Sequence, residues 1–185
     1  MKRTLSLRKA GMRDIPAVLA LINGYAANGI MLPRTEFDLS ENIRDFSVAF
    51  DGHVLVGCGA LHFYTPSVGE VRSLAVLPEA KQNGIGRIVV EALQAEALEY
   101  DLEAIFAFTY VPQFFAKLGF SEVERGELPL KVWRDCLRGC RRKYFLPSVA
   151  DTGRGRWFRL ECACTGLEVM VKRSEAVLLA AESVK

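Results

Sequence analysis

The sequence predicts an α/β protein built on one mixed sheet. Two apolar stretches, 46–50 and 54–64, are separated by an Asp-Gly turn signal, which is typical of an antiparallel hairpin. Downstream, residues 71–100 have the pattern of a strand, a glycine turn and a helix, and residues 104–110 form the continuous apolar run of a central strand. Hairpin strands followed by strand–helix units favour a sheet with both antiparallel and parallel pairs.

Length and composition indicate one domain, or one domain with an appendage. The chain has 185 residues, 50% hydrophobic and 25% charged, which is enough apolar content for a sizeable core. We expect a main domain over residues 1–150 and a C-terminal extension over residues 151–185, because Asp-Thr-Gly-Arg-Gly at 151–155 is typical of a linker. The extension is expected to hold a hairpin of residues 156–161 and 167–172, followed by a short helix.

Charge and pattern argue against several classes of function. The net charge of +2 gives no reason to expect a nucleic-acid partner. No apolar run is long enough to cross a bilayer, and the basic N-terminus lacks the apolar segment of an export signal. We therefore expect no membrane partner and a cytoplasmic location. The five cysteines are then expected to be free thiols. A zinc site of Cys136, Cys140, Cys162 and Cys164 is the alternative, but their spacings are not the usual paired C-x-x-C, so no metal is expected.

The first part of the chain has the signals of one strand and two helices. Residues 4–8 alternate in polarity and predict a strand. Asp14 is a candidate N-cap for the helix that follows it. Residues 30–37 are expected to form a loop, and Ser40 to cap a short helix over residues 41–45.

Glycine and proline mark the strands that follow. Gly57 and Gly59, inside the strand 54–64, predict a bulge or a close neighbour. The next strand, 71–77, is closed by Pro78, since the residue before a proline is biased to extended backbone. After the glycine turn, apolar residues recur at helical spacing and predict the long helix.

Short elements are expected after the central strand at 104–110. Pro112 begins a short helix that Gly119 ends. Residues 120–123 and 144–150 are candidates for further strands.

The turn that follows strand 71–77 has the features of an anion site. Gly84 and Gly86 carry no Cβ, so a ligand can approach the backbone closely. The first amides of the next helix have no intrahelical partner and lie at the positive end of its dipole. Spacing alone leaves a phosphate site and a plain tight turn as alternatives, because the turn matches neither the Rossmann fingerprint nor the P-loop.

Two motifs resemble those of the GNAT family of acetyl-CoA-dependent N-acetyltransferases. Residues 81–86, Lys-Gln-Asn-Gly-Ile-Gly, are similar to the family's pyrophosphate loop. Residues 114–120, Phe-Phe-Ala-Lys-Leu-Gly-Phe, are similar to its late motif. The resemblance covers roughly residues 5–150 and implies a GNAT-like acetyl-CoA-binding fold, with acetyl-CoA as the acetyl donor.

A narrower resemblance is to the short, single-domain amino-acid N-acetyltransferases. It is carried by the separated segments 33–35, 41–46, 56–61, 71–76, 109–112 and 128–136. It implies an N-acetylglutamate synthase, the first enzyme of arginine biosynthesis, acting by direct transfer in a ternary complex. The alternatives are a GNAT enzyme for another amine, such as glutamine or a protein N-terminus, and an acyl-CoA-binding sensor without catalysis.

The resemblance also implies which residues hold acetyl-CoA. Backbone amides at the end of the strand would polarise the thioester carbonyl, and amides of the turn with two cations would hold the diphosphate. The ring of Phe114 or of Phe115 would line the pantetheine channel. These residues are Leu74, Ala75, Val76, Lys81, Gln82, Asn83, Gly84, Ile85, Gly86, Arg87 and Phe115.

For the chemistry, Glu70 is the expected general base, acting through a water. The alternative is a solvated strand-end glutamate, with bulk water taking the proton. Phe115 stands where many family members carry a tyrosine that protonates the leaving thiolate. Tyr110 is the candidate replacement, and unassisted departure of the fairly acidic thiol is the alternative.

An acidic acceptor requires cations. Arg72 shares a strand face with Glu70 and is costly there unless it meets an anion, either a substrate carboxylate or an internal acid. Arg34 and Lys131 are loop cations that match the subfamily's motifs and are candidates for a second carboxylate. His62 is expected to be structural. Strand pairing by the extension in a homodimer is a further hypothesis.

Overall fold

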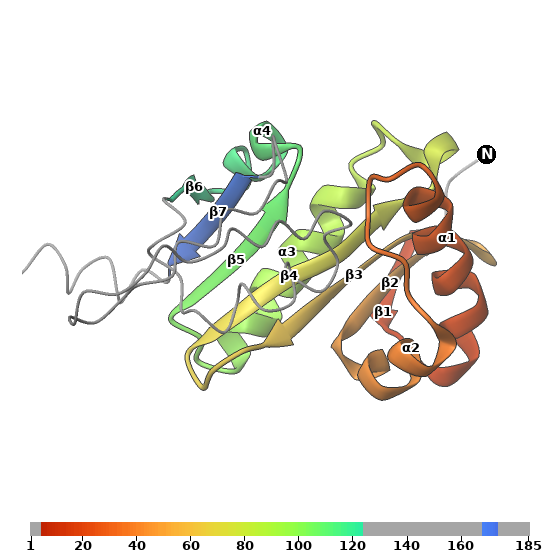
Figure 1. Ribbon diagram of the computed structural model, residues 1–185, viewed down its shortest axis with the longest axis horizontal. Helices are drawn as coiled ribbons and strands as arrows, with labels where there is room; N and C mark the ends of the chain where they lie inside the picture. Colours follow the sequence, from red (N-terminus) through yellow and green to blue (C-terminus); the bar gives the residue numbers. More distant parts are fainter. Residues whose placement is uncertain (1–4, 124–167, 174–185) are drawn as a thin grey trace, which may run out of the picture.

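The computed structural model describes residues 5–123 and 168–173, which form one seven-stranded sheet with helices on both faces (Figure 1). The strand order is β1-β2-β3-β4-β5-β7-β6, and the mixed α/β sheet predicted from the sequence is confirmed. The elements are β1 (Leu5–Lys9), the 3-10 helix η1 (Met12–Asp14), α1 (Ile15–Ala27), α2 (Glu36–Asn42), η2 (Ile43–Asp45), β2 (Phe46–Asp51), β3 (Val54–Phe63), β4 (Val68–Val76), η3 (Pro78–Ala80), α3 (Ile85–Glu99), β5 (Ala104–Thr109), α4 (Pro112–Ala116), β6 (Ser121–Glu122) and β7 (Glu168–Arg173).

Helices cover the two faces of the sheet separately. Neighbouring strands are antiparallel except β4 and β5, which are parallel. Val18 and Ile22 of α1 pack on one face, and Val89 and Leu93 of α3 pack on the other (Figure 1). All four side chains are fully buried, and burial of such a side chain contributes about 1.5–3 kcal/mol. The sheet therefore lies between two apolar cores.

The two strand glycines lie where α3 packs closely on β3. A Cβ added at Gly57 would lie 2.7 Å from Cγ2 of Ile85, and one added at Gly59 would lie 2.9 Å from Cγ1 of Val89. The register of β3 against β4 also shifts at this place, which marks a bulge. The predicted bulge and the predicted close neighbour are both confirmed.

The predicted start of the second helix is wrong. α2 begins at Glu36, inside the expected loop, because Thr35 and Asp38 form a capping box: Thr35 Oγ1 accepts the Asp38 N–H at 3.1 Å, and Asp38 Oδ2 accepts the Thr35 N–H at 3.0 Å. Ser40 lies within the helix, and its hydroxyl donates to the Glu36 carbonyl instead of capping.

Asp14 does not cap α1 with its side chain. Its carboxylate accepts two hydrogen bonds from the Arg8 guanidinium, at 2.7 and 2.8 Å, and a third from the Gly11 N–H at 2.8 Å. The bidentate bond from Arg8 lowers the pKa of Asp14 below its usual value. Asp14 therefore ties the end of β1 to η1.

Residues 168–173 of the expected extension form β7, a strand of the main sheet. β7 lies between β5 and β6 and pairs with both in antiparallel register. Met170 is 3% exposed in the core under α3, and Lys172 Nζ donates to the Leu118 carbonyl at 3.1 Å. The other elements predicted beyond residue 123, at 144–150, 156–161 and 175–184, lie outside the described residues.

Candidate active site

The centre of the sheet opens where β4 and β5 separate (Figure 1). The two strands pair at three positions, the last being Glu70 opposite Phe106, while β4 continues to Val76 and β5 to Thr109. Among residues 5–123 and 168–173, β4 and β5 form no further pair beyond Glu70 and Phe106. The edge of β4 beyond Glu70 therefore carries backbone N–H and C=O groups that β5 does not use, and such groups require partners.

A bulge shifts the alternation of the β4 side chains between the two faces by one residue. Ser73 has a φ of +54°, the left-handed region that a non-glycine residue rarely occupies, and the pairing with β3 skips at this point. Beyond the bulge, Ala75 packs with the α1 core, whereas Leu74 and Val76 pack against the α3 core. The predicted use of these backbone amides to polarise a carbonyl stays a prediction.

Glu70 is buried in β4, with 9% of its surface exposed. Burial raises the pKa of this carboxyl above its usual value, against the opposing effects of Arg72, His62, a hydrogen bond with Tyr64, and Arg34. A carboxylate with a raised pKa is a stronger base, and this environment suits proton abstraction. The geometry is compatible with the predicted role of general base.

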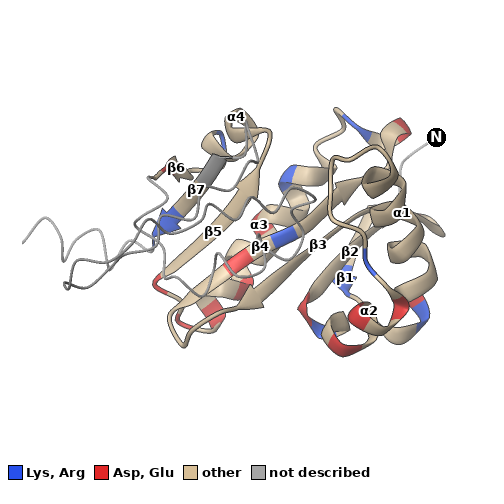
Figure 2. Ribbon diagram, in the orientation of Figure 1, with Lys and Arg blue, Asp and Glu red and all other residues tan. Residues whose placement is uncertain are grey.

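Arg72 lies next to Glu70 in the middle of β4, where Figure 2 shows one acidic and one basic position along the strand. One terminal nitrogen of Arg72 lies 3.4 Å from Asn42 Oδ1 and 3.6 Å from Asp45 Oδ2. Its buried Nε has no hydrogen-bond partner among the described residues. Part of the charge thus meets an internal acid, and one buried donor remains for a ligand.

His62 and Asp45 complete this cluster, and sequence reasoning did not select them as functional. His62 Nδ1 lies 2.9 Å from Asp45 Oδ2, and the same carboxylate oxygen faces Arg72. His62 is also the register partner of Glu70 across β3 and β4. His62 lies opposite Glu70 because of the register between β3 and β4. The sequence alone does not specify that register, so it does not show that the two residues are close.

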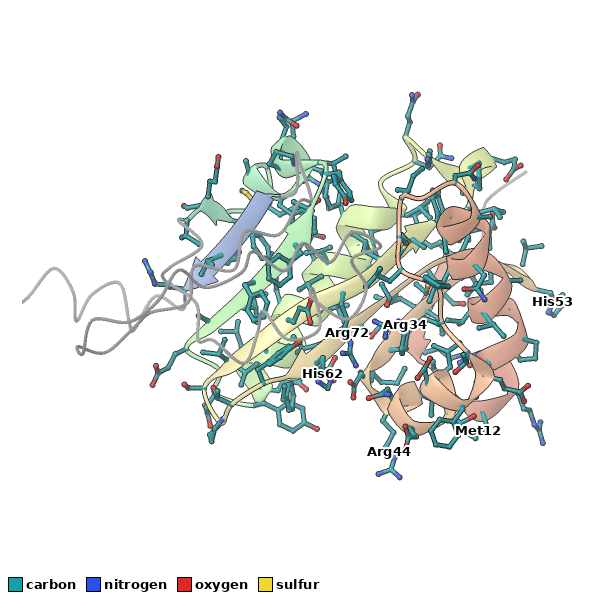
Figure 3. All side chains as sticks on the ribbon, in the orientation of Figure 1. Met12, Arg34, Arg44, His53, His62 and Arg72 are labelled. Carbon is teal, nitrogen blue, oxygen red and sulfur yellow. The ribbon has the colours of Figure 1, made fainter. Side chains whose placement is uncertain are left out.

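Arg34 reaches the cluster from the loop that precedes α2. The Asn23 side chain holds the backbone of Arg34 at both ends: Oδ1 accepts the Arg34 N–H at 2.9 Å, and Nδ2 donates to the Arg34 carbonyl at 3.0 Å. Figure 3 shows Arg34, Arg72 and His62 close together on the same face of the sheet. Lys131, the other predicted cation, lies outside the described residues.

The glycine turn has the geometry of an anion site. Gly84 has a φ of +76° and Gln82 a φ of +66°, and a Cβ on Gly84 would meet no atom within 4 Å. Among the described residues, no hydrogen bond is formed by the backbone amides of residues 82–87, and the first amide to bond, that of Ile88, donates to the Gly84 carbonyl at 3.1 Å. Such amides at the positive end of α3 suit an anion such as a diphosphate. The cofactor contacts predicted for residues 81–87 stay predictions.

Tyr25 links α1 to the end of β4 and to the start of this turn. Its hydroxyl donates to the Val76 carbonyl at 2.6 Å, and Lys81 Nζ lies 4.9 Å from the centre of its ring. This contact places the predicted diphosphate cation beside the end of β4.

The aromatic predictions stay untested. Tyr110 is 50% exposed directly after β5, so its hydroxyl is not confined to the core. Phe115 is 3% exposed and packs edge-on between Phe114 and Phe120. Phe114 is the more exposed of this pair, and its ring lies 3.3 Å from a Cβ built on Gly86, so Phe114 is the nearer ring to the turn.

Thiol and metal chemistry receive no support from the described residues. Cys58 is fully buried, and burial raises the pKa of its thiol to about 12, so it is not a nucleophile. Residues 5–123 and 168–173 contain no cluster of three potential metal ligands.

In the same part of the chain, no helix is long and apolar enough to cross a membrane.

The fold and the glycine turn define the class of protein. Residues 23–120 match the model of the acetyltransferase (GNAT) family, so this chain belongs to the GNAT acetyltransferases. The family and the GNAT-like fold expected from the sequence are confirmed.

Two relatives give the family match more detail. An uncharacterized N-acetyltransferase of Chlorobaculum tepidum is 42% identical over 130 residues, which are 70% of this chain and 84% of that protein. An amino-acid acetyltransferase of Mycobacterium tuberculosis is 34% identical over 135 residues, 71% of this chain and 77% of that protein.

A solved structure extends the comparison to nearly the whole chain. N-acetylglutamate synthase from Neisseria gonorrhoeae, complexed with coenzyme A and N-acetyl-glutamate, matches with a TM-score of 0.74 and 26% identity. The match covers 94% of this chain and 36% of that chain, so this protein spans about a third of the length of that enzyme.

Proposed function

We propose that this protein is an N-acetylglutamate synthase. It transfers the acetyl group of acetyl-CoA directly to the α-amino group of glutamate in a ternary complex, the first step of arginine biosynthesis. The observation that carries the proposal is the buried Nε of Arg72, a donor without a partner among the described residues, beside the buried carboxyl of Glu70. A guanidinium with a donor to spare suits a carboxylate ligand, and a buried base beside it suits an ammonium group.

Each part of the site has a chemical role in this proposal. The backbone amides of residues 82–87 and the cations Lys81 and Arg87 hold the diphosphate of acetyl-CoA. Glu70 takes the proton of the glutamate ammonium group, and the free amine attacks the thioester carbonyl, whose oxygen is held by an amide of residues 74–76. Tyr110 is the proposed donor of a proton to the departing thiolate, and the proton that the nitrogen loses after its attack restores the Tyr110 hydroxyl through water.

The acceptor is held by the cations around Glu70. Arg72 and Arg34 lie on one face of the sheet and are the proposed partners of the glutamate carboxylates, with Lys131 as a third candidate (Figure 3). The names of the relatives support an amino acid as the acceptor, since one is an amino-acid acetyltransferase and another an N-acetylglutamate synthase.

The proposal is tested by mixing the purified protein with acetyl-CoA and a panel of amino acids and measuring the release of free thiol. Turnover is expected with glutamate. Turnover with glutamine but not with glutamate would identify glutamine as the acceptor. Binding of acetyl-CoA without turnover of any amino acid would contradict the proposal and favour the sensor.

A substitution at Arg72 tests the acceptor site. Arg72→Ala is expected to raise the KM for glutamate about 10- to 100-fold, the loss of one charge-assisted hydrogen bond, and to leave the KM for acetyl-CoA unchanged. Arg44→Ala is the matched control, since Arg44 is exposed at the other side of α2 (Figure 3). Equal effects of Arg72→Ala on both KM values would remove Arg72 from the acceptor site.

Three further proposals rest on the sequence. We propose a cytoplasmic location, a homodimer, and a linker near residue 150, after which the extension returns to the sheet of the acetyltransferase domain as β7. Light scattering coupled to size-exclusion chromatography tests the dimer, and a monomer at micromolar concentration would contradict it.

A further inference from the structure

The groups around His62 come from several elements. From β3 itself, Tyr64 lies edge-on to the imidazole, with ring centres 5.2 Å apart. From β4, Glu70 is its register partner, and Arg72 faces the same Asp45 oxygen that His62 contacts. From η2, Asp45 Oδ2 lies 2.9 Å from His62 Nδ1.

The contact with Asp45 determines which ring nitrogen of His62 is available for proton transfer. A carboxylate only accepts hydrogen bonds, so Nδ1 is the nitrogen that carries a hydrogen and donates it. Nε2 is then the nitrogen free to take and release a proton. Asp45 thus holds the imidazole in one tautomer and fixes its orientation.

Glu70 needs a route by which its proton leaves. It is 9% exposed, whereas the side chains of His62 and Asp45 are 29% and 27% exposed. Directly opposed residues of an antiparallel pair have Cβ atoms about 4.5–5.5 Å apart, so His62 is a more exposed neighbour of the Glu70 carboxyl.

We propose that His62 relays the proton of Glu70 to solvent and that Asp45 positions His62 for this step. The inference rests on the proposed function of Glu70 as the base. The Glu70 carboxylate first takes a proton from the substrate ammonium group. The O–H bond of Glu70 then breaks as its proton passes to a bridging water, which gives one of its own protons to Nε2 of neutral His62. The imidazolium, paired with Asp45, finally loses the Nε2 proton to water, and the site returns to its starting charge. His62 acts through Glu70, so it is a positioning residue rather than a catalytic one.

The chain offers a matched pair of variants, because it contains two histidines. His62→Gln keeps a hydrogen-bond donor for Asp45 and removes the titrating ring, and kcat is expected to fall about 100-fold with little change in either KM. His53→Gln changes the exposed histidine of the β2–β3 turn and is expected to leave kcat unchanged. The melting temperature and the Kd for coenzyme A of both variants should equal those of the unaltered protein, which tests folding independently of activity.

Chemical rescue separates a relay from a structural role. The His62→Ala variant is expected to regain at least about one tenth of the lost rate when free imidazole is added, since a small base can replace the missing side chain in a proton transfer. The rescued rate should follow the concentration of neutral imidazole as the pH changes. Loss of kcat without rescue, or an unchanged kcat and pH profile in His62→Gln, would overturn the relay.

The outcomes distinguish this inference from the proposed function. If the unaltered protein acetylates glutamate and His62→Gln behaves like it, the relay fails and the synthase assignment stands. If the unaltered protein acetylates no amino acid, the synthase assignment fails and the relay fails with it.

Discussion

At the scale of residues, Glu70 experiences two opposing effects. Burial raises its pKa, and the neighbouring cations and Tyr64 lower it, with burial the larger influence. The folded protein therefore binds a proton at this carboxyl more readily than the unfolded chain does. The proposed reaction requires the ionised form of Glu70. This form lowers the stability of the folded protein, as is common at functional sites.

We predict that Glu70→Gln lowers kcat/KM about 100-fold at neutral pH. In the unaltered enzyme, activity should fall as the pH decreases through the raised pKa of Glu70, at a higher pH than an ordinary glutamate would give. The variant should lack this acid limb. Steady-state kinetics across the pH range tests this, with Glu91→Gln on the exposed side of α3 as the control. An unchanged acid limb in Glu70→Gln would assign the proton transfer to bulk water.

The same variant has an expected signature in stability. Because the pKa of Glu70 is raised on folding, the ionised carboxyl destabilises the native state above that pKa, and stability is gained as the pH falls through it. Glu70→Gln should thus melt at a higher temperature than the unaltered protein near pH 7.5. The difference should close as the pH approaches the ordinary value of 4.5. Calorimetry at several pH values measures it, and a variant that melts lower at pH 7.5 would contradict the prediction.

At the scale of elements, the close packing of α3 on β3 depends on glycine. We predict that Gly57→Ala destabilises the protein by about 1–3 kcal/mol, because the new Cβ would lie 2.7 Å from Cγ2 of Ile85 and force the helix outward. Gly24→Ala is the control, since a Cβ there meets no atom within 4 Å in the middle of α1, and it should stabilise the protein by about 0.5–1 kcal/mol. Urea denaturation of both variants provides the measurement, and equal midpoints would refute the packing argument.

A structural feature could be predicted from the sequence when its signal lies within a few neighbouring residues. Gly57, Gly59 and Gly84 were informative because the lack of a Cβ is a local property with a local structural meaning. The start of α2 was missed because Ser40 was preferred as the cap, although Thr35 with Asp38 three residues later is the stronger signal.

The composition of the candidate site was harder to predict. Glu70 and Arg72 were recognised because they alternate on one strand. His62 and Asp45 were missed because their proximity depends on the register of β3 against β4 and on the position of η2, and neither has a local sequence signal. Pairing between distant strands also explains why β7 was not placed in the sheet.

At the scale of the whole molecule, β7 completes the sheet from far along the chain. We predict that a chain ending at residue 166 melts roughly 10 °C below one ending at residue 173. The loss of buried Met170 and Val171 costs about 3–6 kcal/mol, and each kcal/mol corresponds to about 2–4 °C at this size. Thermal unfolding of the two truncated chains is the test, and equal melting temperatures would show that β7 adds little to the fold.

The position of β7 also has a consequence for synthesis on the ribosome. β5 is complete once Thr109 has been translated, but the strand that covers its edge begins only at Glu168. At roughly 5–20 residues per second, the nascent chain carries that edge uncovered for roughly three to twelve seconds. An uncovered strand edge can pair with a strand of another nascent chain. Slower translation of the segment between β5 and β7 would lengthen this interval, and the yield of native protein would then depend on the speed of elongation.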